Sequence, residues 1–239
     1  MPRWMQVVGV GLVLLCAGYI YMNLPFVTKR MRVTLEFEVD GKPVAASGVV
    51  EATINKRWEW LSLSTAGASW RGEAIPIELA GHGVLFAVFA YALPLDHRGK
   101  QRIGGHPATM LVSAFNPLNR RTNKGSLGGL TQSHINEIWW RTGTAEVPRE
   151  EWPILIRFTN TGNPMSAQGI EPDNLEPVLG TNIRLKRVLL AMVTEPLTNG
   201  IIKRLPWLEQ FPTSNPLFSG RLGVRAGDLG LGSMHFWRQ

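Results

Sequence analysis

The chain has 239 residues, of which 44% are hydrophobic and 18% are charged, a balance that is typical of a globular protein and excludes an intrinsically disordered one. The formal net charge of +7 favours anionic partners such as lipid headgroups, acidic glycans or nucleic acid, although a basic surface also serves solubility alone. The single cysteine, Cys16, lies in an apolar N-terminal segment, which excludes a disulfide framework, a thiolate metal site and a cysteine nucleophile from the rest of the chain.

The N-terminal segment is uncharged from Trp4 to Val27, and residues 7–22 are nearly all apolar. About 20 apolar residues are needed to cross roughly 30 Å of hydrocarbon. Aromatic residues lie toward both ends of this run, and the cations Lys29, Arg30 and Arg32 follow it. We therefore expect residues 1–28 to form an uncleaved transmembrane anchor.

Two alternatives to an uncleaved anchor are a cleaved signal peptide and a lipoprotein. A cleaved signal peptide needs small residues before the cut, and residues 19–23 offer none. A lipoprotein would be cut before Cys16, where Leu15 occupies the position of a small residue.

The side of the membrane is also open. The positive-inside rule places the rest of the chain in the cytoplasm by one charge. A short N-terminal tail ahead of a large domain is nevertheless the usual layout of a bacterial signal anchor. We expect a bacterial inner-membrane protein whose domain lies on the periplasmic side, with the cytoplasmic side as the alternative.

The first part of the domain has the pattern of a β meander. Residues 33–40 alternate between apolar and polar side chains, as a half-buried strand does. Asp40-Gly41 is a hairpin turn signal, and residues 49–54 supply the returning strand. Residues 57–63 alternate again and predict a third strand.

Further elements follow along the chain. We expect strands at residues 74–79, 84–92, 152–158 and 184–193, with a turn at Gly81-His82-Gly83 between the first two. Residues 109–115 fit either a strand or a helical turn, and residues 132–140 fit a helix. Residues 160–179 are polar and rich in proline, which predicts a surface loop. Residues 198–205 predict a helix with Thr198 as its N-cap.

These elements predict a mainly β domain. We expect a sandwich or partly open barrel with one or two peripheral helices, behind one N-terminal transmembrane helix. The boundaries we expect are an anchor at 1–28, a β-rich soluble domain at 29–211 and a Gly/Pro-rich C-terminal tail at 212–239.

Three stretches of the chain resemble a group of uncharacterised proteobacterial proteins that have an N-terminal signal or anchor and a β-rich domain. These stretches are RVTLEFEVDG at residues 32–41, RGEA at residues 71–74 and KRLPWL at residues 203–208. The resemblance covers roughly residues 30–210 and implies a setting in the bacterial envelope. It implies no activity.

The chemically most unusual stretch runs from His97 to Asn136 and contains no acidic residue. Because residues 1–28 contribute only Arg3, the rest of the chain carries +6, and this stretch alone holds six cations. Each lysine or arginine near an anionic bilayer contributes about 1 kcal/mol of attraction, so the stretch is a candidate contact with the membrane surface. The alternative is a solvated loop. The six candidates are Arg98, Lys100, Arg102, Arg120, Arg121 and Lys124.

Other chemistries have weaker support. The histidines match no common zinc spacing, and His134 with Glu137 lacks a third ligand in sequence. The residues 171–176 could meet calcium but read as a solvated acidic loop. Trp58, Trp60, Trp139 and Trp140 could form a stacking platform, although tryptophan in strands more often packs on the sheet. We therefore expect no metal, no cofactor and no nucleic-acid partner.

The sequence leaves two classes of function. We expect a non-enzymatic envelope protein, a scaffold or interaction module close to an anionic bilayer, whose partners are lipid headgroups or envelope proteins. The alternative is an envelope hydrolase that uses His97 or His134. No nucleophile motif supports that alternative, and the oligomeric state stays open.

Overall fold

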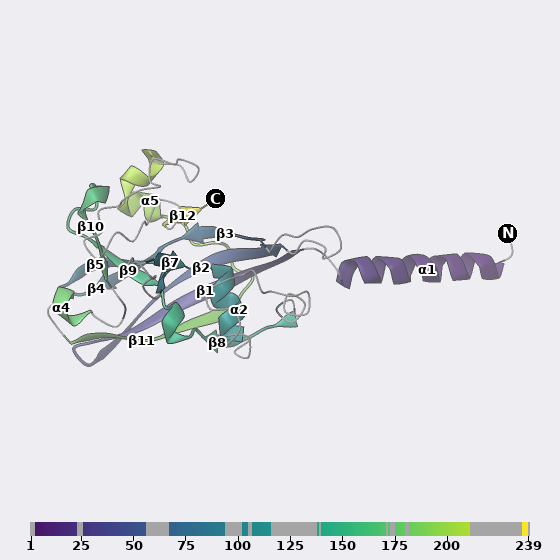
Figure 1. The fold of residues 1–239 in the computed structure, drawn as a ribbon, viewed down its shortest axis with the longest axis horizontal. Helices are drawn as coiled ribbons and strands as arrows, with labels where there is room; N and C mark the ends of the chain where they lie inside the picture. The colour runs from purple at the N-terminus through teal and green to yellow at the C-terminus, as the bar shows by residue number, and fades with distance from the viewer. Residues whose placement is uncertain are drawn as a thin grey trace.

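A computed structural model describes residues 3–22, 26–55, 67–93, 102–104, 107–115, 138, 140–170, 172, 175–179, 182–210 and 236–238. Its strands form two main antiparallel sheets, so the expectation of a mainly β domain is confirmed. The larger sheet has six strands in the order β12-β3-β2-β1-β11-β8 (Figure 1). These strands are β12 (Trp237–Arg238), β3 (Gly67–Glu73), β2 (Lys42–Asn55), β1 (Phe26–Val39), β11 (Ile183–Met192) and β8 (Thr144–Glu146).

The hairpin between β1 and β2 confirms the opening of the predicted meander. Side chains of β1 alternate between buried and partly exposed from Met31 to Val39, which matches the period of two in the sequence. Asp40 and Gly41 both have positive φ, +48° and +75°, as the two-residue turns that suit twisted hairpins require. Both strands extend beyond the predicted bounds. The strand predicted at residues 57–63 lies outside the described residues.

The smaller sheet has four strands in the order β10-β9-β5-β4. They are β10 (Ala167–Ile170), β9 (Ile154–Phe158), β5 (Gly83–Val88) and β4 (Ile75–Leu79). A separate two-stranded ribbon joins β6 (Tyr91–Leu93) to β7 (Arg102–Gly104). The prediction of a loop over residues 160–179 is wrong at β10, because a four-residue strand is too short to leave a recognisable period in the sequence.

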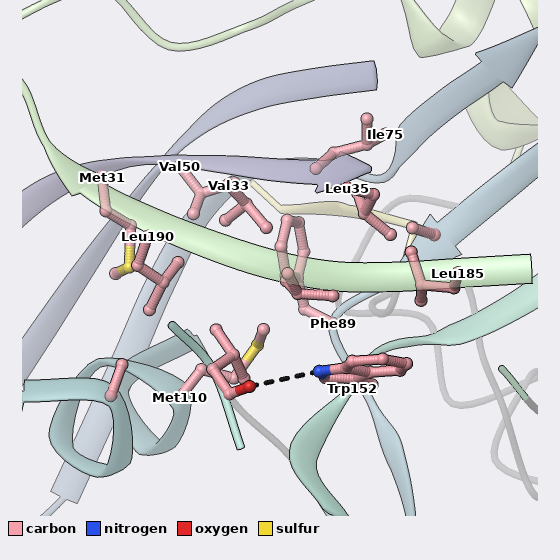
Figure 2. Packing of buried hydrophobic residues seen from close by; sticks show 14 of the residues in the cluster. Met31, Val33, Leu35, Val50, Ile75, Phe89, Met110, Trp152, Leu185 and Leu190 are labelled. Atoms are coloured by element: carbon pink, nitrogen blue, oxygen red, sulfur yellow. Dashed lines mark hydrogen bonds between the residues drawn. The ribbon is translucent and has the colours of Figure 1, made fainter. Parts of the chain in front are cut away.

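The two sheets face each other over a shared apolar cluster, an arrangement consistent with a β-sandwich. Leu35 and Val33 of β1 enter this cluster from the larger sheet, and Ile75 of β4 enters it from the smaller one (Figure 2). A second cluster covers the other face of the smaller sheet, where Phe86 and Phe158 pack against residues near the C-terminus. The central strands of the smaller sheet, β5 and β9, are therefore largely buried on both faces.

The helices behind α1 are short. α2 (Pro107–Phe115) settles the stretch that fitted either a strand or a helical turn. All nine of its residues are buried, so it belongs to the core and corrects the expectation that the helices are peripheral. The other short helices of the described residues, in which η marks a 3-10 helix, are η3 (Arg149–Glu151), η4 (Pro164–Ser166), α4 (Glu176–Leu179), α5 (Ile201–Arg204) and η5 (Pro206–Gln210).

The N-terminal helix α1 (Arg3–Met22) lies apart from the sheets, beyond the end of the larger sheet at which β1 begins (Figure 1). In the part of the chain that the structure describes, no helix has the length and apolarity that a membrane crossing requires. The expected fold, with a transmembrane helix ahead of the β domain, is therefore wrong in that respect.

Candidate functional site

The apolar side chains of α1 are exposed to solvent on every side of the helix. Val7 and Leu15 are 72% and 73% exposed, and Val8, Val10, Leu12, Val13, Leu14 and Tyr19 are similarly open. Successive helical residues are rotated by about 100°, so these positions cover the full circumference. Monomeric soluble proteins seldom expose an apolar surface of this extent, and such surfaces mark contacts with lipid or another protein.

A row of charges crosses three strands at the end of the larger sheet that lies toward α1. The register places Arg30 of β1 opposite Glu51 of β2, and Glu51 opposite Arg71 of β3. Arg30 Nε donates to Glu51 Oε2 at 2.9 Å, while Arg71 Nη1 lies 3.7 Å from Glu51 Oε1. One carboxylate therefore serves two guanidinium groups, and Arg71 remains 60% exposed.

Further residues lie at the same end. Arg32 pairs with Glu195 just after β11. Gly143 accepts a hydrogen bond from Met192, which itself lies opposite Met31 of β1. The chain ahead of Gly143 therefore lies level with the start of β1, and this chain carries the exposed side chains of Arg141 and Trp140.

We call this surface the α1-proximal rim. Among the described residues, this surface holds four arginines and two glutamates, a net charge of +2. Its residues are Arg30, Arg32, Arg71, Trp140 and Arg141, with Glu51 and Glu195.

The opposite half of the same sheet face holds direct ion pairs. Arg187 Nε donates to Glu36 Oε2 at 2.6 Å, and Lys186 Nζ lies 2.9 Å from Glu38 Oε2. The hydrogen bond to Glu36 and the negative charges of Glu36 and Glu146 raise the pKa of Arg187. The register of β1 and β11 shifts here, so that Lys186 and Arg187 both point away from the core.

Lys29 is the one charged residue among the alternating inner positions of β1. It lies between the buried Val27 and Met31 and opposite Ala52 of β2. Partial burial lowers the pKa of its ammonium group below the ordinary value of 10.5.

An open surface hollow of about 510 Å³ lies where β8 ends beside β11. Its charged lining mixes two acids with two bases, Glu146 and Glu150 with Arg149 and Lys186. The Arg149 guanidinium lies 5.5 Å from the centroid of the Trp152 ring, and Trp152 Nε1 donates to the Val147 carbonyl at 3.1 Å. These contacts fix the wall of the hollow, and its balanced charges favour no single class of ligand.

Two buried carboxylates have structural partners. Ser113 Oγ donates to Glu151 Oε1 at 2.6 Å, which ties α2 to η3. Glu73 Oε2 accepts a hydrogen bond from the Ile201 amide at 2.8 Å, which holds the start of α5. Within the described ranges, no group of three or more histidine, cysteine, aspartate or glutamate side chains could hold a metal ion. His82 lies in the predicted turn between β4 and β5.

The surface predicted from the sequence falls mostly outside the described residues. Arg98, Lys100, Arg120, Arg121 and Lys124 lie there, and Arg102 is described only as part of the backbone of β7. His97, His106 and His134 also lie outside. Contact between this stretch and a membrane therefore stays a prediction, as does the hydrolase alternative.

The sequence did not reveal the α1-proximal rim. Arg30 and Arg32 were visible as cations that follow the apolar segment, but Arg71 and Arg141 are 41 and 111 residues away from Arg30. Only strand pairing brings them to one end of the sheet. No family model matches the chain, and neither a curated protein nor a solved structure matches it.

Proposed function

We propose that the protein is a non-enzymatic interaction module that works at a lipid surface, to which α1 binds through its apolar side chains. The observation that carries this proposal is the exposure of apolar side chains around the whole circumference of α1. A protein partner that offers a groove covers one face of a helix, whereas the acyl chains of a lipid layer contact all of them. The proposal requires contact with lipid and makes no claim that the helix crosses the layer.

A valine or leucine side chain gains about 1.5–3 kcal/mol when it is fully removed from water. The seven exposed valines and leucines of α1 therefore supply a strong force for binding to any apolar phase. The resemblance of residues 30–210 to proteobacterial envelope proteins supports the bacterial envelope as the setting.

Cys16 makes the test specific. It is the only cysteine of the chain and is exposed on α1, so a polarity-sensitive fluorophore attached to it reports on the surroundings of the helix. On addition of phosphatidylcholine vesicles, we expect the emission of the full chain to shift to the blue and the protein to float with the vesicles. A probe that stays in water would refute the proposal.

A matched pair of variants separates α1 from the domain. Leu12→Asp combined with Leu15→Asp places two charges on exposed positions of α1 and is expected to abolish flotation. Ala45→Asp combined with Ser47→Asp places the same charges on exposed positions of β2 and is expected to leave flotation unchanged.

A further inference from the structure

We propose that the α1-proximal rim binds the anionic headgroups of a lipid bilayer, with Trp140 at the boundary between headgroups and acyl chains. This inference rests on the proposed function, since α1 brings the rim to the surface. It identifies which part of the domain faces the lipid and which lipid charge the domain prefers.

Chain length places the rim near lipid. Met22 ends α1 and Phe26 begins β1, so their Cα atoms are at most about 14 Å apart. Arg30 follows four strand residues later, which adds about 13 Å. The outer face of the larger sheet therefore reaches the surface at this end when the domain tilts toward the lipid.

The charge of the rim selects anionic lipid. Among the described residues, Arg30 is bonded to Glu51 and Arg32 to Glu195, so that with Arg71 and Arg141 the rim has two more positive than negative charges. In the described part of the chain, the carboxylate that Arg71 approaches is that of Glu51 at 3.7 Å, a separation that leaves its guanidinium able to bind a phosphate instead. On the other half of the sheet face, the described cations Arg184, Lys186 and Arg187 are matched in number by Glu36, Glu38 and Glu146.

Trp140 provides an independent observation. It is 67% exposed, which is unusual for the largest apolar side chain, and it is next to Arg141. Tryptophan is enriched at membrane interfaces, because its ring is apolar and its N–H group is polar. A tryptophan next to an exposed arginine is therefore a composition that suits a headgroup surface.

The test uses the full chain and two kinds of vesicle, phosphatidylcholine alone and phosphatidylcholine mixed with phosphatidylglycerol. We expect the wild type to bind the mixed vesicles more tightly, and this preference to fall in physiological salt relative to low salt. Arg71→Gln combined with Arg141→Gln should reduce the preference by about 25-fold, at about 5-fold for each arginine. Binding to phosphatidylcholine alone should stay unchanged.

A matched control removes the same charge elsewhere. Arg184 lies opposite Glu38, eight strand residues from Arg30 and hence about 26 Å away, and Lys203 lies in α5. Arg184→Gln combined with Lys203→Gln should keep the preference for mixed vesicles. Trp140→Ala should weaken binding to both kinds of vesicle several-fold, and circular dichroism establishes that each variant is folded.

The outcomes separate the two proposals. If the wild type binds neither kind of vesicle, the proposed function fails. If the wild type binds both kinds of vesicle but the double arginine variant keeps the preference for mixed vesicles, the proposed role of the rim is wrong and the role of α1 stands. The same conclusion follows if the control variant loses the preference equally.

Discussion

Thr198 and Val49 hold each other through two hydrogen bonds. The Val49 amide donates to Thr198 Oγ1 at 2.7 Å, and the Thr198 amide donates to the Val49 carbonyl at 3.1 Å. The pairing of β3 with β2 ends at Glu51. Beyond that point, Thr198 forms the hydrogen bonds along this edge of β2. The prediction that Thr198 caps a helix is therefore wrong, since α5 begins after Gly200 and has no side-chain cap.

Replacing this hydroxyl should weaken the fold. Thr198→Val keeps the shape of the side chain but leaves the Val49 amide without the acceptor, and we expect the free energy of unfolding to fall by about 1–3 kcal/mol. Urea denaturation measures the change. Thr198→Ser retains the hydroxyl and should lose clearly less; equal losses in the two variants would show that the hydrogen bond contributes nothing.

Glu73 should stabilise the start of α5 as a hydrogen-bond acceptor. It is 7% exposed, and its carboxylate receives the Ile201 amide. Glu73→Ala should cost about 1–3 kcal/mol, because it leaves this buried amide unbonded, and should speed hydrogen exchange at Ile201. Glu73→Gln keeps an acceptor oxygen and should preserve the protection; loss of protection in both variants would contradict the assigned role.

Gly72 and Gly81 differ in what a methyl group would meet. Both have positive φ, +136° and +79°, but a Cβ on Gly72 would lie 2.8 Å from Val50 Cγ1 and 3.2 Å from Val50 Cα, whereas one on Gly81 meets nothing within 4 Å. We expect Gly81→Ala to cost about 1 kcal/mol from backbone strain. Gly72→Ala should cost about 2–4 kcal/mol, because a clash with β2 is added. Thermal unfolding of both variants measures the two losses of stability. A smaller loss for Gly72→Ala than for Gly81→Ala would contradict the predicted clash with Val50.

Lys29 should make stability depend on pH in the alkaline range. Its pKa is lower in the folded chain than the ordinary 10.5, so just below pH 10.5 the unfolded chain binds more protons. Stability from this group therefore rises with pH through that window. We expect Lys29→Met to be more stable than the wild type at neutral pH, and the difference to shrink as the pH approaches 10.5. Urea midpoints at several pH values measure it; a constant difference would contradict the burial of the ammonium group.

Local patterns predicted much of the fold. The alternation in β1 and the Asp40-Gly41 turn were readable because strand period and hairpin geometry depend on neighbouring residues only. The sequence of α2 fitted both a strand and a helical turn, because its burial depends on contacts with distant parts of the chain. All nine of its residues are buried, so no polar face shows the helical period.

The main strands, the first hairpin and the apolar character of the N-terminal segment could be predicted from the amino-acid sequence, since each depends on residues within a short window. The contacts between distant residues could not, because they depend on how the strands pair and cross. Arg30 and Glu51 are 21 residues apart, Glu73 and Ile201 are 128 apart, and Val49 and Thr198 are 149 apart. Each contact requires a particular strand register or chain crossing. The free energy that selects this register and these crossings comes from burial of the whole core, and no single segment of the sequence contains a pattern that specifies it.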